Sequence, residues 1–303
     1  MQNIKKLKIL IAIDEPALAK TIVHTTCNII DKGNSEITLL NVLETTNIEE
    51  EYFYKEPQKF IEHEAEKSDF AYLENFLENE EEIEYKGFIY REGHASKNIL
   101  DVASNENYDL IVLGSHNKQG LRRFFLGSVS YNVSKYSKSS VLVIKPATCP
   151  QIPKDSNFSV LFAVDNSDFS TYVSGQIGIF LDKKRAEVTI LNVTLPIQEI
   201  IPPDAYVYTD IAKIMEESNL VAEEIIRDAA INVAKQRLTV KNKYHITGDP
   251  ASTIINEAEK NKSSLIIVGS HSKSIFSDFI MGSISTKIYE HSTLPVLIIK
   301  YAF

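Results

Sequence analysis

The sequence predicts two tandem α/β domains, each a doubly wound parallel sheet covered by helices on both faces. Three observations lead to this fold class. The chain has 303 residues, enough for two domains of about 150 residues. One pattern of residues occurs twice, and each copy alternates short apolar runs with longer amphipathic stretches, as βα units do.

The repeat is the strongest of these observations. Leu110-Ile-Val-Leu-Gly-Ser-His116 recurs as Leu265-Ile-Ile-Val-Gly-Ser-His271, 155 residues further on, and Ile11-Ala-Ile-Asp14 matches Phe162-Ala-Val-Asp165 at an offset of 151. The change in offset places the difference in length between the second and third strands of the copies. We infer a tandem duplication of one domain.

Four short runs in the first copy have the length and the β-branched composition of strands. Because the runs are almost wholly apolar, each is expected to be buried on both faces, as in a parallel sheet covered by helices. The predicted strands are residues 8–13, 37–42, 109–114 and 140–145.

Helical spacing occupies the stretches between these strands. Pro16–Asp31 is followed by Gly33, a typical helix stop, and Pro57–Leu77 begins at a proline, which the first turn of a helix tolerates. Ala95–Asn105 and Ser128–Tyr136 complete the βα alternation.

A linker is predicted between the copies. Residues 145–158 contain three prolines among polar residues, and proline cannot continue a central strand. The expected organisation is therefore a first domain over residues 1–146, a linker over 147–157 and a second domain over 158–303.

Composition and charge exclude several classes of protein. With 44% hydrophobic and 24% charged residues, the chain has the composition of soluble globular domains and not of disordered chains. Acids outnumber Lys and Arg by 41 to 32, and the net charge of −9 argues against nucleic-acid binding. No apolar run approaches the roughly 18 to 20 residues of a membrane helix. Within Glu44–Glu84, 15 acids accompany three lysines, and a solvated helix face is a simpler interpretation than a partner surface.

The cysteines and histidines do not predict a metal site. Cys27 and Cys149 are too few for a disulfide framework or a metal cage, and His116 and His271 lack a nearby His or Cys at ligand spacing. The basic start of the chain does not have the pattern of a secretion signal. A reducing cytoplasm is the expected location.

In open α/β sheets, ligands bind beyond the carboxyl ends of the strands, and three features of the first copy converge there. Asp14 closes the first strand, Gly114 closes the fourth, and Gly127-Ser128 opens the last helix. A carboxylate there accepts from a ribose hydroxyl or holds Mg²⁺ through water, glycine admits a ligand to the backbone, and helix N-terminal amides bind anions. An N-cap, a tight turn and a serine cap are the structural alternatives. The second copy repeats the features at Asp165, Gly269, Gly282 and Ser283.

These residues carry a resemblance to the universal stress protein family. It rests on Ile9–Asp14, on the Gly-x-x-x, nine residues, Gly-Ser run over 114–128, and on the Ser-Val-Leu-Val-Ile run at 140–144. Gly248-Asp-Pro-Ala251, followed by Leu265–Lys300, resembles the family more closely still. The resemblance covers both copies and nearly the whole chain.

The resemblance implies a particular architecture. Each domain is expected to have an adenine nucleotide alpha hydrolase-like fold, with five parallel strands in the order 3-2-1-4-5. Family members often pair through their last strands, so Val141–Lys145 is expected beside Val296–Lys300 in an internal pseudo-dimer. Further homodimerisation is left open.

The nucleotide-binding motif departs from the family pattern. ATP-binding members are expected to carry Gly-x-x-Gly, nine residues, then Gly-Ser or Gly-Thr, whereas Asn117 and Ser272 replace the second glycine here. Asparagine adopts positive φ more readily than most residues, while serine is merely small.

Charge in the following loop favours the first copy as the better site, because cations are favourable near a triphosphate. The first copy has three cations there, Lys118, Arg122 and Arg123. The second has Lys273 with Ser277 and Asp278, and an acid weakens triphosphate binding unless Mg²⁺ intervenes.

The family's nucleotide contacts map onto one set of positions in each copy, flanking base and sugar or surrounding phosphate. In the first copy they are Asp14, Val42, Leu113, Gly114, Asn117, Gly127, Ser128 and Val129. In the second they are Asp165, Val193, Val268, Gly269, Ser272, Gly282, Ser283 and Ile284.

The resulting hypothesis is a non-catalytic stress-response protein that binds ATP or another adenine nucleotide, with or without Mg²⁺. No nucleophile with a base and an orienting acid is evident, so at most weak ATPase activity is expected and no catalytic residue is assigned. The alternatives are an interaction scaffold that binds no nucleotide, and a binder of an apolar metabolite, which the aliphatic residues of 204–238 suggest.

Overall fold

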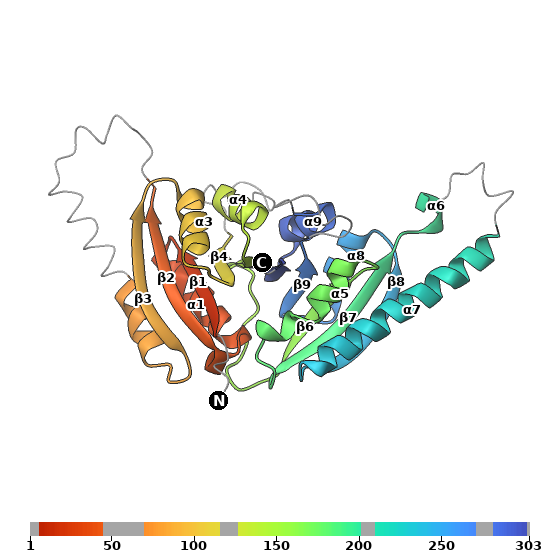
Figure 1. Ribbon diagram of the computed structural model, residues 1–303, viewed down its shortest axis with the longest axis horizontal. Helices are drawn as coiled ribbons and strands as arrows, with labels where there is room; N and C mark the ends of the chain where they lie inside the picture. The colour runs from red at the N-terminus through yellow and green to blue at the C-terminus, as the bar shows by residue number, and fades with distance from the viewer. Residues whose placement is uncertain (1–5, 45–69, 116–126, 201–209, 271–280, 302–303) are drawn as a thin grey trace.

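The computed structural model describes residues 6–44, 70–115, 127–200, 210–270 and 281–301. A single ten-stranded sheet runs through both halves of the chain, in the order β3-β2-β1-β4-β5-β10-β9-β6-β7-β8 (Figure 1). All neighbours pair parallel except β5 and β10. The predicted tandem α/β fold is confirmed.

The strands of the two halves occur in the same order along the chain. The strands are β1 (Leu7–Ile13), β2 (Ser35–Leu43), β3 (Glu84–Glu92), β4 (Leu110–Gly114), β5 (Ser140–Ile144), β6 (Phe158–Val164), β7 (Ala186–Thr194), β8 (Thr239–Thr247), β9 (Leu265–Gly269) and β10 (Val296–Ile299). The helices are α1 (Pro16–Ile29), α3 (Ala95–Asn105), α4 (Ser128–Tyr136), α5 (Asp168–Ser174), α6 (Ile197–Ile200), α7 (Ile211–Lys235), α8 (Pro250–Lys260) and α9 (Ser283–His291).

The four strands predicted in the first half are all present. The predicted helix over Pro16–Asp31 ends at Ile29, because Ile30 is already extended, and Gly33 lies in a short 3₁₀ turn after it. Most of the helix predicted over Pro57–Leu77 lies outside the described residues, and its described end, from residue 70, is helical.

The family resemblance implied a third strand in each half, but no run of residues located it. β3 and β8 occupy the two edges of the sheet, and their residues are largely half-buried or exposed. Edge strands have more polar and less regular sequences, because they pair with one neighbouring strand only and are covered on one face. The same register irregularity in β2 and β7, at Ile37/Thr38 and Val188/Thr189, shows that the duplication extends to backbone detail.

The core consists of two apolar layers, one on each face of the sheet. Ile9 and Ile11 pack on the face covered by α1, α5 and α7, whereas Leu10 packs on the face covered by α3, α4, α8 and α9. Successive strand residues point to opposite faces, so a strand buried on both sides must be apolar throughout. This explains the unbroken apolar runs that predicted the strands.

The halves join where β5 and β10 pair antiparallel, with Val143 opposite Val296 and Val141 opposite Ile298. We call this pairing the seam. The expected placement of Val141–Lys145 beside Val296–Lys300 is confirmed.

Two lysines cross the seam in a reciprocal arrangement. Lys145, after β5, donates from Nζ to the carbonyl oxygens of Tyr289 (2.8 Å) and Ser292 at the end of α9. Lys300, after β10, donates from Nζ to the carbonyl oxygen of Lys135 (3.3 Å) in the last turn of α4. The last carbonyls of a helix carry partial negative charge, so each half supplies a cation to the final helix of the other.

Arg185 holds the connection between the halves. The structure has no strand or helix over residues 145–157, and the Arg185 guanidinium donates to the carbonyl oxygens of Pro153, Ser156 (2.9 Å) and Asn28 (3.2 Å). One side chain of the second half thereby fixes the connection against the first half.

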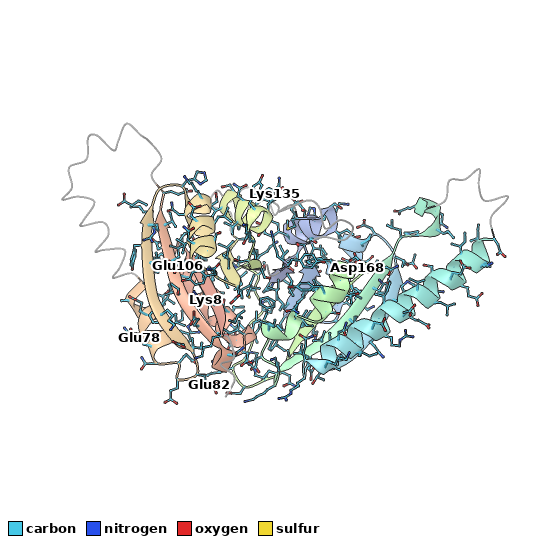
Figure 2. All side chains as sticks on the ribbon, in the orientation of Figure 1. Lys8, Glu78, Glu82, Glu106, Lys135 and Asp168 are labelled. Atoms are coloured by element: carbon cyan, nitrogen blue, oxygen red, sulfur yellow. The ribbon has the colours of Figure 1, made fainter. Side chains whose placement is uncertain are left out.

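The acidic stretch is described only over residues 70–84. Glu78 and Glu82 are exposed (Figure 2), while Glu80 pairs with Lys32 (2.7 Å) and Lys154 (2.9 Å). Residues 45–69 lie outside the described residues. Across the parts of the chain that the structure describes, no helix combines the length and apolarity that crossing a membrane requires.

The seam lysines predict a pH dependence of stability. Burial lowers the pKa of both Lys145 and Lys300 to about 8, against about 10.4 for lysine in an unfolded chain. Between these values the unfolded state binds more protons, so the free energy of unfolding rises with pH by on the order of 1 kcal/mol per pH unit for each lysine. Urea titrations between pH 8 and 10 measure this slope.

The comparison variant is the double substitution Lys145→Met with Lys300→Met. In this variant the free energy of unfolding should no longer rise with pH through the two lysines. The opposite effect of Cys27 should remain, because burial raises the pKa of its thiol to about 12. The exposed Lys287→Met change on α9 is the matched control and should keep the wild-type slope. Equal slopes in wild type and the double variant would show that the two lysines are not desolvated.

Candidate functional site

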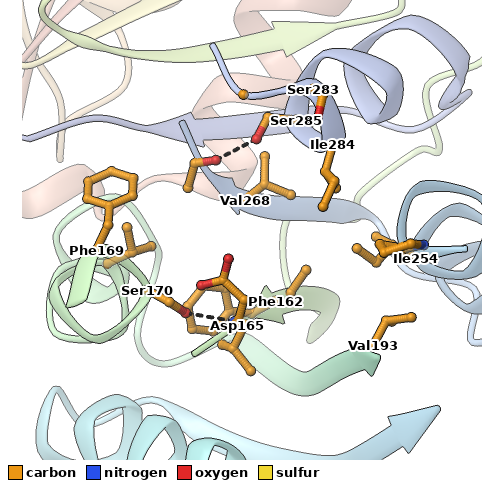
Figure 3. Close-up of a pocket in the computed structure, with 16 residues that line it drawn as sticks. Phe162, Asp165, Phe169, Ser170, Val193, Ile254, Val268, Ser283, Ile284 and Ser285 are labelled. Carbon is orange, nitrogen blue, oxygen red and sulfur yellow. Dashed lines mark hydrogen bonds between the residues drawn. The ribbon is translucent and has the colours of Figure 1, made fainter. Parts of the chain in front are cut away.

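A narrow pocket of about 100 Å³ lies at the carboxyl ends of β6, β7 and β9 in the second half (Figure 3). Its walls are mainly apolar, and it also exposes one carboxylate and several serines. The apolar walls come from Phe162, Phe169, Val173, Val193, Ile254 and Val268, and the polar groups from Asp165, Ser170, Ser283 and Ser285.

The pocket gathers the residues that the sequence predicted for the second half. Parallel strands bring their carboxyl ends to one edge of the sheet, which explains why positions more than 100 residues apart meet there. The predicted residues that line it are Asp165, Val193, Val268, Gly269, Gly282, Ser283 and Ile284. Ser272 lies outside the described residues.

Asp165 directs its carboxylate toward the centre of the pocket (Figure 3) and accepts a hydrogen bond from the Ser167 hydroxyl. Ser167, not Asp165, is the N-cap of α5, since its Oγ accepts from the amide of Ser170 (3.0 Å). Asp14 likewise precedes the N-cap of α1, which is Glu15. The helix-capping alternative for the two aspartates is therefore wrong.

Gly269 owes its lack of a side chain to packing. A Cβ there would lie 2.8 Å from Cε1 of Phe169, and a Cβ at Gly114 would lie 2.7 Å from Cδ1 of Ile22. The glycines let α5 and α1 pack closely on the strands, while the backbone of Gly269 still lines the pocket.

Gly282 is the N-cap of α9 and Ser283 its first helical residue, so the serine is not the cap. The arrangement repeats in the first half, where Gly127 precedes Ser128 at the start of α4. Neither N-cap has a side-chain hydrogen bond. The amides of a first helical turn have no intrahelical acceptors, so this end of α9 favours a negatively charged group beside the pocket.

The first half has the same arrangement of strand ends. Asp14 follows β1, Val42 lies on β2, and Leu113 on β4 pairs with Ala12 of β1. Gly114 ends β4, and Gly127, Ser128 and Val129 begin α4. The loop positions that the sequence singled out lie outside the described residues in both halves: His116, Asn117, Lys118, Arg122, Arg123, His271, Lys273, Ser277 and Asp278.

Several site residues escaped prediction. Phe169 and Ser170 reach the pocket from α5, and Pro250 and Ile254 reach it from α8. A signal for α8 existed in Gly248-Asp-Pro-Ala251, because Asp249 caps that helix by accepting from the amide of Ser252 (3.0 Å), which also lowers the pKa of its carboxyl. No local pattern marked the α5 residues.

A buried asparagine supports the site in each half. Asn41 donates from Nδ2 to the carbonyl oxygen of Ile13 (3.1 Å), and Asn192 donates to that of Val164 (2.9 Å). Each bond ties the second strand of its half to the last residue of the first strand, directly beneath the aspartate. The repeated Leu-Asn-Val sequence was a signal for this pair, but its role required the structure.

Within the described residues, no three His, Cys, Asp or Glu side chains form a group that would hold a metal ion. The site therefore offers one carboxylate, serine hydroxyls, a helix N-terminus and apolar walls. These groups suit the binding of a small polar molecule with a flat apolar part.

The fold defines an α/β protein built by duplication of one domain. The family model described as the universal stress protein family matches residues 7–145 and again 157–300, and the chain belongs to that family.

Known relatives agree with the duplication. A universal stress protein of Mycolicibacterium smegmatis is 22% identical over 211 residues, covering 69% of this chain and 67% of the relative, and YxiE of Bacillus subtilis is 28% identical over 46% of this chain and 97% of its own length. A crystal structure of a universal stress protein from Archaeoglobus fulgidus covers 97% of this chain and 98% of its own, with a TM-score of 0.64 at 20% identity. A universal stress protein solved in complex with cAMP covers 48% of this chain at 19% identity, with a TM-score of 0.34.

The packing of the two glycines predicts unequal costs of adding a methyl group. Gly269→Ala should destabilise the fold by about 1–3 kcal/mol, because the rigid Phe169 ring cannot move aside. Gly114→Ala should cost less, since the Ile22 δ-methyl has another rotamer. Thermal unfolding of the two variants measures the difference, and equal costs would contradict this account of the glycines.

Proposed function

We propose that the protein binds an adenine nucleotide without catalysing a reaction, at the carboxyl edge of one or both halves. The observation that carries the proposal is the second-half pocket, where apolar walls, the Asp165 carboxylate and the start of α9 meet. Each of these groups alone has an ordinary structural use. Their convergence at one strand edge matches the three chemical parts of a nucleotide.

The fit can be followed part by part. The walls formed by Val193, Ile254 and Val268 suit the faces of a purine ring, which is flat and largely apolar. The Asp165 carboxylate is an acceptor suited to ribose hydroxyls. The amides of Ser283 and Ile284 in the first turn of α9 suit phosphate oxygens, whereas the Gly282 amide already donates to the carbonyl oxygen of Ser270 (2.6 Å).

The proposal extends to the first half by the repeat. Asp14, Val42, Leu113, Gly114, Asn117, Gly127, Ser128 and Val129 are the equivalent binding positions there, and the charge of the 118–123 loop still favours this half for a triphosphate. Mg²⁺ would be held there through the phosphates and a carboxylate oxygen. We assign no catalytic residue, and the domain boundaries 1–146, 147–157 and 158–303 and a cytoplasmic location remain part of the proposal.

A binder of an apolar metabolite is the second candidate. It is favoured by the ten apolar residues around the second-half pocket, which outnumber the four residues with polar side chains. An apolar ligand would use the walls but gain nothing from Asp165 or from the helix N-terminus. The two candidates therefore differ in their dependence on the carboxylate.

Asp165→Asn tests that dependence. In a chain carrying Gly127→Val to block the first half, the substitution should weaken Mg-ATP binding by about tenfold, because ribose loses hydrogen bonds to a charged acceptor. Isothermal titration calorimetry measures the affinity.

The matched control is Asp168→Asn, which changes a nearby acid in the first turn of α5 that does not line the pocket. It should leave the affinity within about twofold. Absence of saturable Mg-ATP binding in the wild-type chain would overturn the proposal. An affinity that Asp165→Asn leaves unchanged would show that the Asp165 carboxylate does not contact the nucleotide.

A further inference from the structure

We infer that Tyr289, a residue of the second half, is a positioning residue for the proposed nucleotide site of the first half. Tyr289 lies on α9 and is fully buried, yet its hydroxyl reaches across the seam to Ser130 on α4, with 2.9 Å between the two oxygens. Ser130 lies in the first turn of α4, three residues after Gly127. This inference rests on the proposed function, because it concerns the helix end that would meet phosphate.

The Tyr289 hydroxyl, the Ser130 hydroxyl and the Gly127 carbonyl form a short chain of hydrogen bonds. The Ser130 hydroxyl donates to the carbonyl oxygen of Gly127 (3.1 Å), and a serine hydroxyl has a single hydrogen. When that hydrogen lies on the Gly127 carbonyl, Ser130 Oγ accepts its hydrogen bond from Tyr289. Burial raises the pKa of Tyr289 to about 12, although its contacts with Ser130 and Ser115 act in the opposite direction, so the phenol keeps its proton at neutral pH.

Other contacts fix Tyr289 firmly enough to serve as a reference point. Its carbonyl oxygen accepts from Lys145 Nζ (2.8 Å), and its ring lies 6.3 Å from that of Tyr131 on α4. The backbone of the residue is thus held by the first half, and so is its hydroxyl. The N-terminal turn of α4 is positioned by the other half of the molecule.

The second half lacks the reciprocal contact, which makes the two sites different. Ser285, at the position of Ser130, donates to Gly269 of its own half (2.6 Å). Ser134, at the position of Tyr289, is buried, and its hydroxyl has no hydrogen-bond partner among the described residues. The start of α9 is therefore set from within its own half, whereas the start of α4 depends on the seam.

Tyr289→Phe removes only the hydroxyl and tests the inference in the full chain. We expect hydrogen exchange at the amides of residues 131–133, whose hydrogen bonds close the first turn of α4, to become about fivefold faster, as the loss of one hydrogen bond permits, while the equivalent residues 286–288 are unchanged. Ser130→Ala should give at least this change, because it also removes the hydrogen bond to the Gly127 carbonyl, and adding Tyr289→Phe to it should cause no further change. Ser134→Ala is the matched control and should alter neither segment.

Binding gives the second readout. In a chain carrying Gly282→Val, which blocks the second half, Tyr289→Phe should weaken Mg-ATP binding to the first half by about fivefold. In the chain carrying Gly127→Val, it should leave binding to the second half unchanged. A purely structural role of Tyr289 would weaken both sites or neither.

The outcomes separate this inference from the proposed function. If exchange at residues 131–133 is unchanged by Tyr289→Phe, or if both helix starts loosen equally, the positioning role is overturned, whatever the protein binds. If exchange changes selectively but the wild-type chain binds no nucleotide, the proposed function fails and the positioning of α4 by Tyr289 stands.

Discussion

The pairing of β5 with β10 is the contact on which the rest of the structure depends. It turns two five-stranded sheets into one sheet of ten strands and buries Val141, Val143, Val296 and Ile298 at its centre. An unpaired apolar edge strand would be a site of aggregation, and duplication within one chain removes that hazard for β5 and β10 together. The remaining edges, β3 and β8, are polar, as exposed edges tend to be.

At the seam, each half also supplies a lysine ammonium group to the other half. Lys145 and Lys300 follow β5 and β10 directly, so the strand pairing delivers each ammonium group to the last turn of the opposite helix. Desolvating a lysine is unfavourable, and carbonyl acceptors at a helix C-terminus offset part of that cost. The halves are consequently not two independent domains on a tether, because each contributes to the helix that closes the other.

Duplication has produced equivalent folds with unequal sites. Both halves keep the aspartate after the first strand, the buried asparagine beneath it and the glycine that begins the last helix. They differ where side chains meet the seam, at Ser134 and Tyr289, and in the helix after the first strand, where Ile22 and Phe169 occupy equivalent places beside the glycines. Such differences allow one half to respond to the other while the second keeps its own geometry.

The sequence predicted what repeats locally and missed what depends on distant contacts. The buried strands were evident because burial on both faces leaves an unbroken apolar run, as in residues 110–113. β3 and β8 were missed because their exposed residues have no such run. The positions at the strand ends followed from the fold class and the family resemblance, but the packing reason for Gly269 required the position of Phe169. The link between Tyr289 and Ser130 depends on the register across the seam, which no local pattern contains.

We propose that this folded, duplicated chain binds an adenine nucleotide at its strand ends. The mass of the intact protein under native conditions, after equilibration with Mg-ATP, tests it most directly. We expect protein species heavier by one or two nucleotides, which release adenine nucleotide on denaturation. A spectrum containing only the bare chain at saturating Mg-ATP would contradict it.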